Sequence, residues 1–275
     1  MTNLVLLTMS TLKPIQLLLA LTVGYTSLLG ANSGLLATTP VNPRNNNNIS
    51  TAHKKNTFVQ PPLPNSERRP GGRVRGGAKR GTCPSVEPQL TALVPFTQDA
   101  PTITNVWGLT TKAHPTFLFY VPYAKDSGYP TEFVLQDQDT NIIYQKAIAL
   151  PEKPGIISVS LPADVAGLAV DKQYRWFFTV ECDQQKPAPP IYVEGVVQRV
   201  QLTPATAKQL ETASPLQQVA IYGENGIWFE AANTLFQMLQ TNPQDPAIQE
   251  NWRRLLTSIS LGDIVTKPMV SHKLQ

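Results

Sequence analysis

Histidine and cysteine are scarce in this sequence, and the scarcity argues against several kinds of site. The 275 residues include three histidines and two cysteines. Without a CxxC pair, the chain has too few of the usual ligands for a structural zinc site. It also has no GxSxG nucleophile elbow and no GxxxxGKS/T phosphate loop. We therefore expect no metal ion and no cofactor, and the sequence favours a non-enzymatic role.

Charged residues make up 15% of the chain, and they are unevenly placed. Nine of the 23 Lys and Arg residues lie between residues 44 and 80, beside Glu67 as the one acidic residue. From Gly81 onward there are 13 basic and 18 acidic residues. A folded domain that binds nucleic acid carries its positive charge on the domain itself, whereas the expected domain here is mildly acidic. We therefore expect no nucleic-acid partner.

Long apolar runs are absent apart from a short one near the N-terminus. Lys13 precedes PIQLLLALTVG, and the small residues of TSLLGANSGLLA follow. This layout is typical of a secretory signal peptide, while a membrane span needs about 20 apolar residues. We predict a signal peptide over 1–37, cleaved after Ala37 (or after Ala31 or Ser33), with an uncleaved signal anchor as the alternative. The mature chain would then be periplasmic or extracellular, without a stable transmembrane span.

Residues 38–82 have little apolar surface to bury. They are rich in Asn, Pro, Gly and Arg, as in NPRNNNNIS and RRPGGRVRGG. This composition is typical of disorder, because so little burial does not offset the entropy of folding. RGG-like text suggests RNA binding in a cytosolic or nuclear protein, but in an exported protein we predict a solvated basic linker. Its charges could instead attract an anionic polymer of the cell envelope.

The two cysteines, Cys83 and Cys182, stand at the start and near the end of the region that we expect to fold. An isolated cysteine pair in an oxidising compartment favours a disulfide. A metal site is the alternative, and three scattered histidines give it little support. We predict a structural disulfide between Cys83 and Cys182.

Short apolar runs separated by turn residues dominate the middle of the chain. Phe133 and Leu135 alternate with polar residues, and Trp176 and Phe178 do the same, which is the two-residue period of a half-buried strand. Seven such strands are predicted, at 90–95, 117–123, 131–138, 141–150, 155–162, 173–182 and 190–202. Their number and spacing predict an antiparallel immunoglobulin-like β-sandwich over 83–202.

Helical patterns replace the strands at Thr203. Thr203-Pro204 and Ser214-Pro215 each combine an N-cap residue with proline at the first helical position. Apolar residues then recur at helical spacing over 226–241 and 243–259. We predict a short α-helical segment over 203–266 that packs on the sandwich, because a single helical hairpin cannot bury its own apolar face. A tail over 267–275 follows, and the fold class is mainly β.

Several segments together resemble one protein family. They are RGTCP, LTALVP, LTTKAHPTFLFYVPY, EFVLQDQDTNIIY, PGIISVSLP, YRWFFTVECD, VEGVVQRV and ENGIWFEA. In this order they closely resemble the cyanobacterial family called domain of unknown function 928, over about residues 80–265. The resemblance implies an exported cyanobacterial protein. It implies no activity, because the family carries none that can be transferred.

Two groupings of acidic residues are candidates for chemistry. Asp137-x-Asp139-x-Asn141 begins like a calcium loop, but isoleucine stands where such a loop needs glycine and an acidic residue. We predict a polar hairpin turn there. Carboxylate pairs such as Glu181/Asp183 or Glu224/Glu230 are compatible with glycoside hydrolysis, which needs two carboxylates across a cleft.

The segment YGENGIWFEA is the most distinctive polar and aromatic cluster. Tyr222, Glu224, Asn225 and Trp228 could line a ledge for a ligand such as a sugar. The alternative is that the aromatic rings attach the helices to the sheet. Our leading hypothesis is an exported non-enzymatic module that interacts with a protein or an anionic envelope polymer. A carbohydrate-active enzyme that uses paired carboxylates is the alternative.

Overall fold

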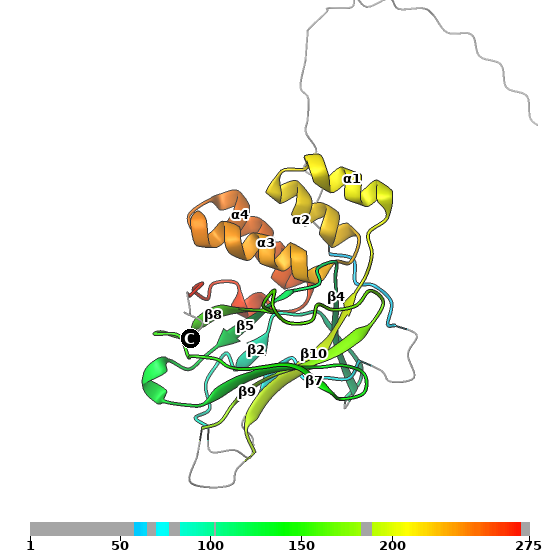
Figure 1. Cartoon of the computed structure of the whole chain (residues 1–275). Helices are drawn as coiled ribbons and strands as arrows, with labels where there is room; N and C mark the ends of the chain where they lie inside the picture. Colours follow the sequence, from blue (N-terminus) through cyan, green and yellow to red (C-terminus); the bar gives the residue numbers. More distant parts are fainter. Residues whose placement is uncertain (1–57, 65–69, 77–82, 102, 183–188, 271–275) are drawn as a thin grey trace, which may run out of the picture. The chain divides into compact units, whose positions relative to one another are not determined.

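Two β-sheets and a helical segment make up the part of the chain that the structure describes (Figure 1). A computed structural model describes residues 58–64, 70–76, 83–101, 103–182 and 189–270. The predicted signal peptide and its cleavage sites lie outside these residues. The prediction of a mainly β fold with C-terminal helices is confirmed.

The smaller sheet has four strands, and each pairs with its neighbours in antiparallel fashion. In spatial order they are β1 (Arg75–Gly76), β2 (Leu90–Ala92), β5 (Thr116–Val121) and β8 (Gly155–Ser160). Strands β5 and β8 are buried along nearly their whole length. This sheet therefore forms one apolar layer of the core.

The larger sheet has six strands. In spatial order they are β3 (Phe96–Ala100), β4 (Ile103–Thr110), β10 (Ile191–Arg199), β9 (Gln173–Val180), β6 (Thr131–Gln136) and β7 (Ile142–Ala147). Strands β4 and β10 are parallel, and the other neighbours are antiparallel. The sheet is thus mixed, which corrects the prediction of an antiparallel sandwich.

Aromatic rings from both sheets meet in the core. Phe117 and Phe119 on β5 contact Phe133 on β6 and Phe178 on β9, with ring centroids 5.0 Å apart for Phe117–Phe133 and 4.5 Å apart for Phe119–Phe178. Trp176 on β9 lies 5.7 Å from Phe119 and is 1% exposed. The alternation seen in the sequence therefore places these rings between the sheets, where large aromatic side chains contribute most to burial.

Residues 70–76, here called the strap, are inserted into the sandwich. The backbone of β4 pairs with β10 only over Trp107–Thr110. Before that point Asn105 of β4 pairs with Gly71, and Glu194 of β10 pairs with Arg73. The strap then crosses to the smaller sheet and continues as β1, beside β2. The predicted linker over 38–82 is therefore wrong for these residues, because the strap forms backbone hydrogen bonds with both sheets.

Steric crowding explains why glycine stands at position 72 of the strap, within the segment RRPGGRVRGG. A Cβ atom on Gly72 would lie 2.5 Å from the Glu194 carbonyl oxygen and 2.8 Å from the Cβ atom of Val106. Both neighbours belong to paired strands and cannot move aside, so glycine is required where the backbones approach this closely. Composition alone suggested disorder, whereas the small residues permit tight packing.

Arginines in and beside the strap make contacts with other parts of the protein. The Arg75 guanidinium donates two hydrogen bonds to the Asp263 carboxylate, at 2.9 and 2.7 Å, and this is the bidentate geometry that favours arginine. The Arg73 guanidinium lies 4.6 Å from the centre of the Tyr192 ring. Arg175 donates to the Gly71 carbonyl oxygen at 2.8 Å. This usage favours a structural role for the basic motif over binding of RNA.

The Arg75–Asp263 pair predicts a pH-dependent contribution to stability. Hydrogen bonds from Arg75 hold the pKa of Asp263 below its ordinary value. The stabilisation is therefore complete above the ordinary pKa of an aspartate, about 3.9, and is lost as the pH falls through the lowered value. Because both side chains are partly exposed, we expect Asp263→Asn to lower the free energy of unfolding by about 0.5–1 kcal/mol at pH 7.

Urea unfolding of both proteins between pH 7 and strongly acid pH measures this contribution. The gap between wild type and Asp263→Asn should shrink as the pH falls below about 4. Glu152→Gln is the matched control, because the Glu152–Lys125 pair is far more exposed. A gap that stays constant across the acid range would contradict the assignment.

The four helices lie within the segment 203–266 that the sequence predicts to be helical. They are α1 (Pro204–Thr212), α2 (Pro215–Glu224), α3 (Trp228–Thr241) and α4 (Pro246–Ser258). The Thr203 hydroxyl accepts from the Thr206 N–H, and Ser214 forms a capping box with Gln217. Asp245 caps α4 by accepting from the N–H groups of Ala247 and Ile248. These caps involve residues that are neighbours in the sequence, which explains why a helix start can be predicted from the sequence.

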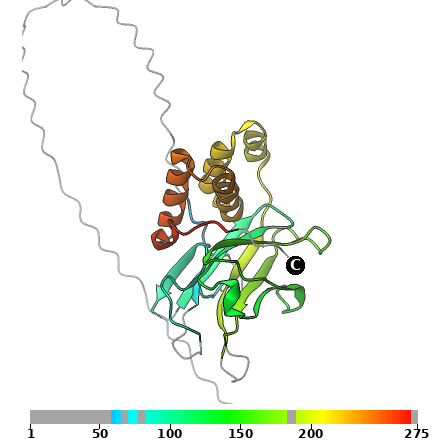
Figure 2. The same ribbon diagram turned by 90° about the vertical axis from the view of Figure 1, so that its left-hand side faces the viewer.

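The helices gather at one end of the sandwich, and α3 packs against β4 and β5 (Figures 1 and 2). The Phe229 ring lies 5.2 Å from that of Phe117, and Gly108 on β4 leaves room for Trp228 and Phe229. The Trp228 Nε1–H donates to the Leu93 carbonyl oxygen at 2.8 Å. Strand and helix thus share one continuous core.

The chain beyond α4 returns to the smaller sheet. It forms a 3-10 turn, η2 (Gly262–Ile264), and then runs beside β8. The Ile156 N–H donates to the Pro268 carbonyl oxygen at 2.8 Å, and the Val270 N–H donates to the Ile156 carbonyl oxygen at 3.0 Å. The predicted tail over 267–275 is therefore corrected, since its first residues cover a sheet edge that would otherwise expose unpaired backbone groups.

The predicted disulfide between Cys83 and Cys182 is confirmed. Cys83 lies before β2 of the smaller sheet, and Cys182 follows β9 of the larger one. The bond therefore joins the two sheets covalently across a sequence separation of 99 residues. Among the helices in the described ranges, none is long and apolar enough to cross a membrane.

Candidate functional site

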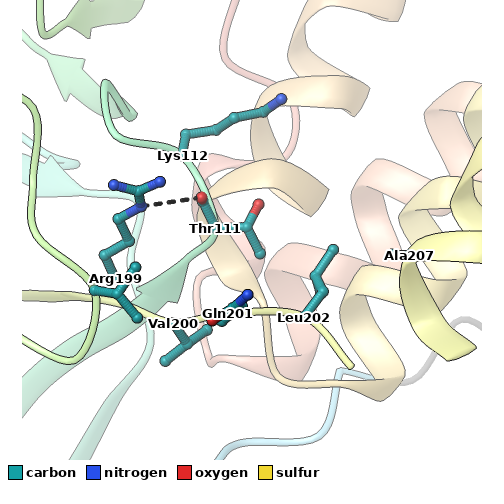
Figure 3. A pocket seen from close by; sticks show the side chains of 8 residues that line it. Thr111, Lys112, Arg199, Val200, Gln201, Leu202 and Ala207 are labelled. Carbon is teal, nitrogen blue, oxygen red and sulfur yellow. Dashed lines mark hydrogen bonds between the residues drawn. The ribbon is translucent and has the colours of Figure 1, made fainter. Parts of the chain in front are cut away.

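A hollow of about 440 Å³ lies where the sandwich meets α1 (Figure 3). Its walls come from the segment after β4, the loop before β9, the end of β10 and the start of α1. The lining residues are Thr111, Lys112, Val170, Arg199, Val200, Gln201, Leu202 and Ala207. The hollow therefore combines aliphatic walls with a few polar and cationic groups.

The parallel pairing of β4 and β10 creates this hollow. Arg199 pairs with Thr110, and the Val200 N–H donates to the Thr110 carbonyl oxygen at 2.8 Å. Because both strands run in the same direction, they end at the same edge of the sheet. The segments that follow them, 111–112 and 200–202, therefore leave side by side and form neighbouring walls.

Arg199 is held in place by carbonyl oxygens. Its Nη1 donates to the Leu168 carbonyl oxygen at 2.6 Å, and its Nε donates to the Thr111 carbonyl oxygen at 3.3 Å. These bonds fix the guanidinium without neutralising its charge. The lining residues include Lys112 as a second cation and contain no Asp or Glu. The charged side chains that line the hollow are thus both cationic, within a domain that is mildly acidic overall.

Lys112 and Arg199 approach the hollow differently. The Lys112 side chain is exposed and extends away from Arg199, so the two cationic groups stand apart (Figure 3). Arg199 is half-buried and rigidly bonded. A planar guanidinium in fixed geometry suits a carboxylate or a sulfate, while a flexible ammonium adds attraction at longer range.

Glu230 of α3 fixes the wall that carries Lys112. Its Oε1 accepts from the Thr110 hydroxyl at 2.7 Å and from the N–H groups of Thr111 and Lys112 at 3.0 and 3.2 Å. The side chain is 7% exposed, and its Oε2 is buried without a hydrogen-bond partner. Glu230 therefore connects the helical segment to the hollow as a positioning residue. The sequence named Glu230 only as one half of a carboxylate pair.

The predicted ligand ledge is not formed by all four of its residues. Trp228 is fully buried, so its ring is not available to a ligand. Tyr222 is half-buried, and burial, with a smaller effect of the Glu230 charge, raises its pKa. Glu224 and Asn225 are exposed, and the Asn225 side chain donates to the Ile221 carbonyl oxygen at 2.8 Å. For Trp228 the structure supports the alternative, in which the ring attaches the helices to the sheet.

Of the two predicted carboxylate pairs, the structure describes both members only of Glu224/Glu230, and these two do not form a site. Asp183 lies outside the described residues, and Glu230 is buried beside Thr110 with one oxygen already bonded, so Glu224 and Glu230 do not face each other across an open cleft. No group of three His, Cys, Asp or Glu side chains in the described ranges is placed to hold a metal ion.

The turn at Asp137 has a structural explanation. The Asp137 carboxylate accepts from the N–H groups of Asp139 and Asn141 and from the Asn141 side-chain amide, each at 2.9 Å. The bond from the Asn141 side chain is the largest cause of the lowered pKa of Asp137. These contacts close the turn between β6 and β7, in agreement with the predicted hairpin.

A family model described as Domain of Unknown Function (DUF928) matches residues 75–269. The chain belongs to the DUF928 family. The match includes every residue that lines the hollow and most of both sheets, while Gly71, Gly72 and Arg73 of the strap precede it. No curated protein and no solved structure matches the chain.

Proposed function

We propose that this DUF928 protein is a non-enzymatic binding module, and that it holds an anionic group of a cell-envelope polymer in the hollow beside Arg199. The observation that carries the proposal is the cationic lining without a carboxylate. Val170, Leu202 and Ala207 supply aliphatic surface next to the charge. A uronic acid residue of a polysaccharide has this chemistry, since its carboxylate lies beside the apolar C–H face of a sugar ring.

The proposal includes export from the cytoplasm. A disulfide between Cys83 and Cys182 supports an oxidising compartment. The N-terminal pattern of Lys13 followed by a short apolar run supports a secretory signal. A cyanobacterial origin is also part of the proposal, and it rests on the resemblance of the sequence segments.

We further propose that the sandwich is immunoglobulin-like. Two facing sheets of short strands, a buried Trp176 and a disulfide that joins the sheets support this interpretation. The strap and the parallel β4–β10 pair would then be additions to that plan. The proposed binding activity does not depend on this classification.

Titration calorimetry with trigalacturonate, an anionic sugar oligomer, tests the binding activity. We expect Arg199→Gln to weaken binding by about tenfold or more, because a charge-assisted hydrogen bond is removed. Added salt should weaken binding to wild type, since part of the attraction is electrostatic. Maltotriose, which carries no carboxylate, should not bind.

Two further variants separate a lost charge from a disturbed fold. Lys112→Gln removes an exposed cation of the hollow, and we expect it to weaken binding several-fold without changing stability. Lys153→Gln removes an equally exposed cation near Gly155, which pairs with Val121 at the far end of β5. Equal weakening by Lys112→Gln and Lys153→Gln would show a general charge effect and reject the hollow as the site.

A further inference from the structure

The N-terminal segment 58–64 (FVQPPLP) lies on the turn between α2 and α3. The Phe58 ring meets the Trp228 ring edge to face, with centroids 4.9 Å apart, and Phe58 is 8% exposed. The Val59 N–H donates to the Gly223 carbonyl oxygen at 3.0 Å. This segment was predicted to belong to the linker over 38–82, and that prediction is wrong here because Phe58 has a buried aromatic partner.

The surface beneath the segment is shaped by a glycine. We call it the Phe58 groove and define it by Gly223, Gly226 and Trp228. A Cβ atom on Gly226 would lie 3.0 Å from the Val59 carbonyl oxygen and 3.1 Å from Cδ of Pro61. Gly226 also has φ of 70°, which favours glycine. The missing side chain of Gly226 therefore leaves room for the backbone of Val59 and for the ring of Pro61.

The segment fills this groove imperfectly. Gln60 Nε2 is buried without a hydrogen-bond partner, which is unfavourable for a polar group. The Val59 side chain is 52% exposed and contributes little burial. Within the described part of the chain, one backbone hydrogen bond joins the segment to the helices. A peptide with an apolar residue in place of Gln60 would make the same contacts without this penalty.

The groove and its occupant belong to different parts of the chain. The residues of the Phe58 groove lie within the family match over 75–269, whereas segment 58–64 lies before it. The DUF928 match thus includes Trp228, on which Phe58 packs, but does not include Phe58 itself. Aromatic grooves that accept extended proline-rich peptides are a common mode of protein recognition, because such peptides lose little entropy on binding.

We propose that the Phe58 groove is a docking site for a partner protein, which inserts an aromatic residue followed three and four positions later by proline. Segment 58–64 is then a tethered occupant that the partner displaces. This site lies on the α2–α3 turn and shares no residue with the hollow that Arg199 lines. The inference goes beyond the proposed function and does not rest on it.

Fluorescence anisotropy with a labelled FVQPPLP peptide and the full chain tests the proposal. A tethered occupant lowers the apparent affinity by the fraction of time for which the groove is open. We expect Phe58→Ala to bind the peptide about tenfold more tightly than wild type, because it weakens the occupant. We expect Gln60→Met to bind it more weakly than wild type, because it removes the unfavourable contact of the occupant. A peptide with alanine in place of phenylalanine should not bind.

Equal affinity of wild type, Phe58→Ala and Gln60→Met for the peptide, or no binding by any of them, would overturn the proposal. Near-ultraviolet circular dichroism checks that the variants are folded. If Phe58→Ala is not folded, hydrogen exchange of wild type tests the proposal instead. Excess peptide should displace the segment and accelerate exchange of the Val59 amide, which is bonded to Gly223. No acceleration would also overturn the proposal.

Sedimentation of wild type over a range of concentrations shows whether segment 58–64 of the same chain or of a second copy fills the groove. We expect a monomer. A dimer that forms with wild type and is lost with Phe58→Ala would show that the segment of a second copy fills the groove, and would overturn the assignment to a partner protein.

Discussion

Replacement of both Cys83 and Cys182 by alanine will lower the free energy of unfolding by about 4 kcal/mol. The disulfide closes a sequence separation of 99 residues and joins the two sheets. In the unfolded chain such a cross-link removes many conformations, so its loss stabilises the unfolded state. Urea unfolding of the oxidised protein and of the double variant measures the difference directly.

A matched comparison isolates the covalent bond from the side chains. Wild type unfolded in the presence of a reducing agent retains both sulfur atoms and should lose nearly as much stability as the double variant. A loss below about 1 kcal/mol in both experiments would mean that the two sheets retain their arrangement in the unfolded ensemble.

Glu230→Ala will lower the free energy of unfolding by about 3 kcal/mol, the second large effect that we expect. The Glu230 carboxylate is buried, and its Oε1 accepts from the Thr110 hydroxyl and from the N–H groups of Thr111 and Lys112. Truncation removes the acceptor of the Thr110 hydroxyl and of the Thr111 N–H, while the Lys112 N–H keeps the Thr110 hydroxyl oxygen at 3.1 Å. Truncation also opens a small cavity. Thermal and urea unfolding both report this loss.

Glu230→Gln is the control that separates hydrogen bonding from volume. Glutamine keeps an acceptor oxygen for the same donors, and its amide nitrogen would replace the unbonded Oε2. We expect a loss of about 1 kcal/mol, well below that of alanine. Because Glu230 positions the segment that carries Lys112, Glu230→Ala should also weaken trigalacturonate binding in conditions where it is folded. Equal stability losses for the two variants would contradict the hydrogen-bond explanation.

Local patterns in the sequence were sufficient for much of the fold. The alternation at Phe133 and Leu135 marks β6, and that at Trp176 and Phe178 marks β9, because one face of each strand is buried. Each of the seven predicted strand segments overlaps an observed strand. Proline after Thr203 and after Ser214 marks the start of two helices, since caps act on neighbouring residues.

Strands β3 and β4 are absent from the sequence prediction, and the reason is physical. Strand β4 buries two polar residues, Asn105 and Thr110. The Asn105 side chain donates to Asp99 on the neighbouring strand β3 at 2.8 Å, and the Thr110 hydroxyl donates to Glu230, which is 120 residues away. A buried polar side chain is favourable only with such partners, and these partners are not visible in a local pattern.

The candidate sites were hardly predictable from the sequence. The cluster around Tyr222 and Trp228 was recognised, but its rings belong to the core and to the Phe58 groove. In the sequence, Arg199 is simply a charged residue at the end of an apolar strand, and nothing there indicates a binding site. Its function as a wall of the hollow depends on the carbonyl oxygens of Thr111 and Leu168 and on the parallel partner β4. No short motif encodes that combination.

The sequence by itself determined the cysteine pairing, seven of the strands and the helical segment that follows them, and the scarcity of catalytic groups, because each depends on composition or on neighbours along the chain. The tertiary structure alone decided the insertion of the strap, the hollow at Arg199 and the occupied Phe58 groove. Each of these joins segments that are distant in sequence, such as Arg73 with Glu194 and Phe58 with Trp228. Their stability comes from close backbone approach and burial, and these exist only after the sheets and helices have packed together.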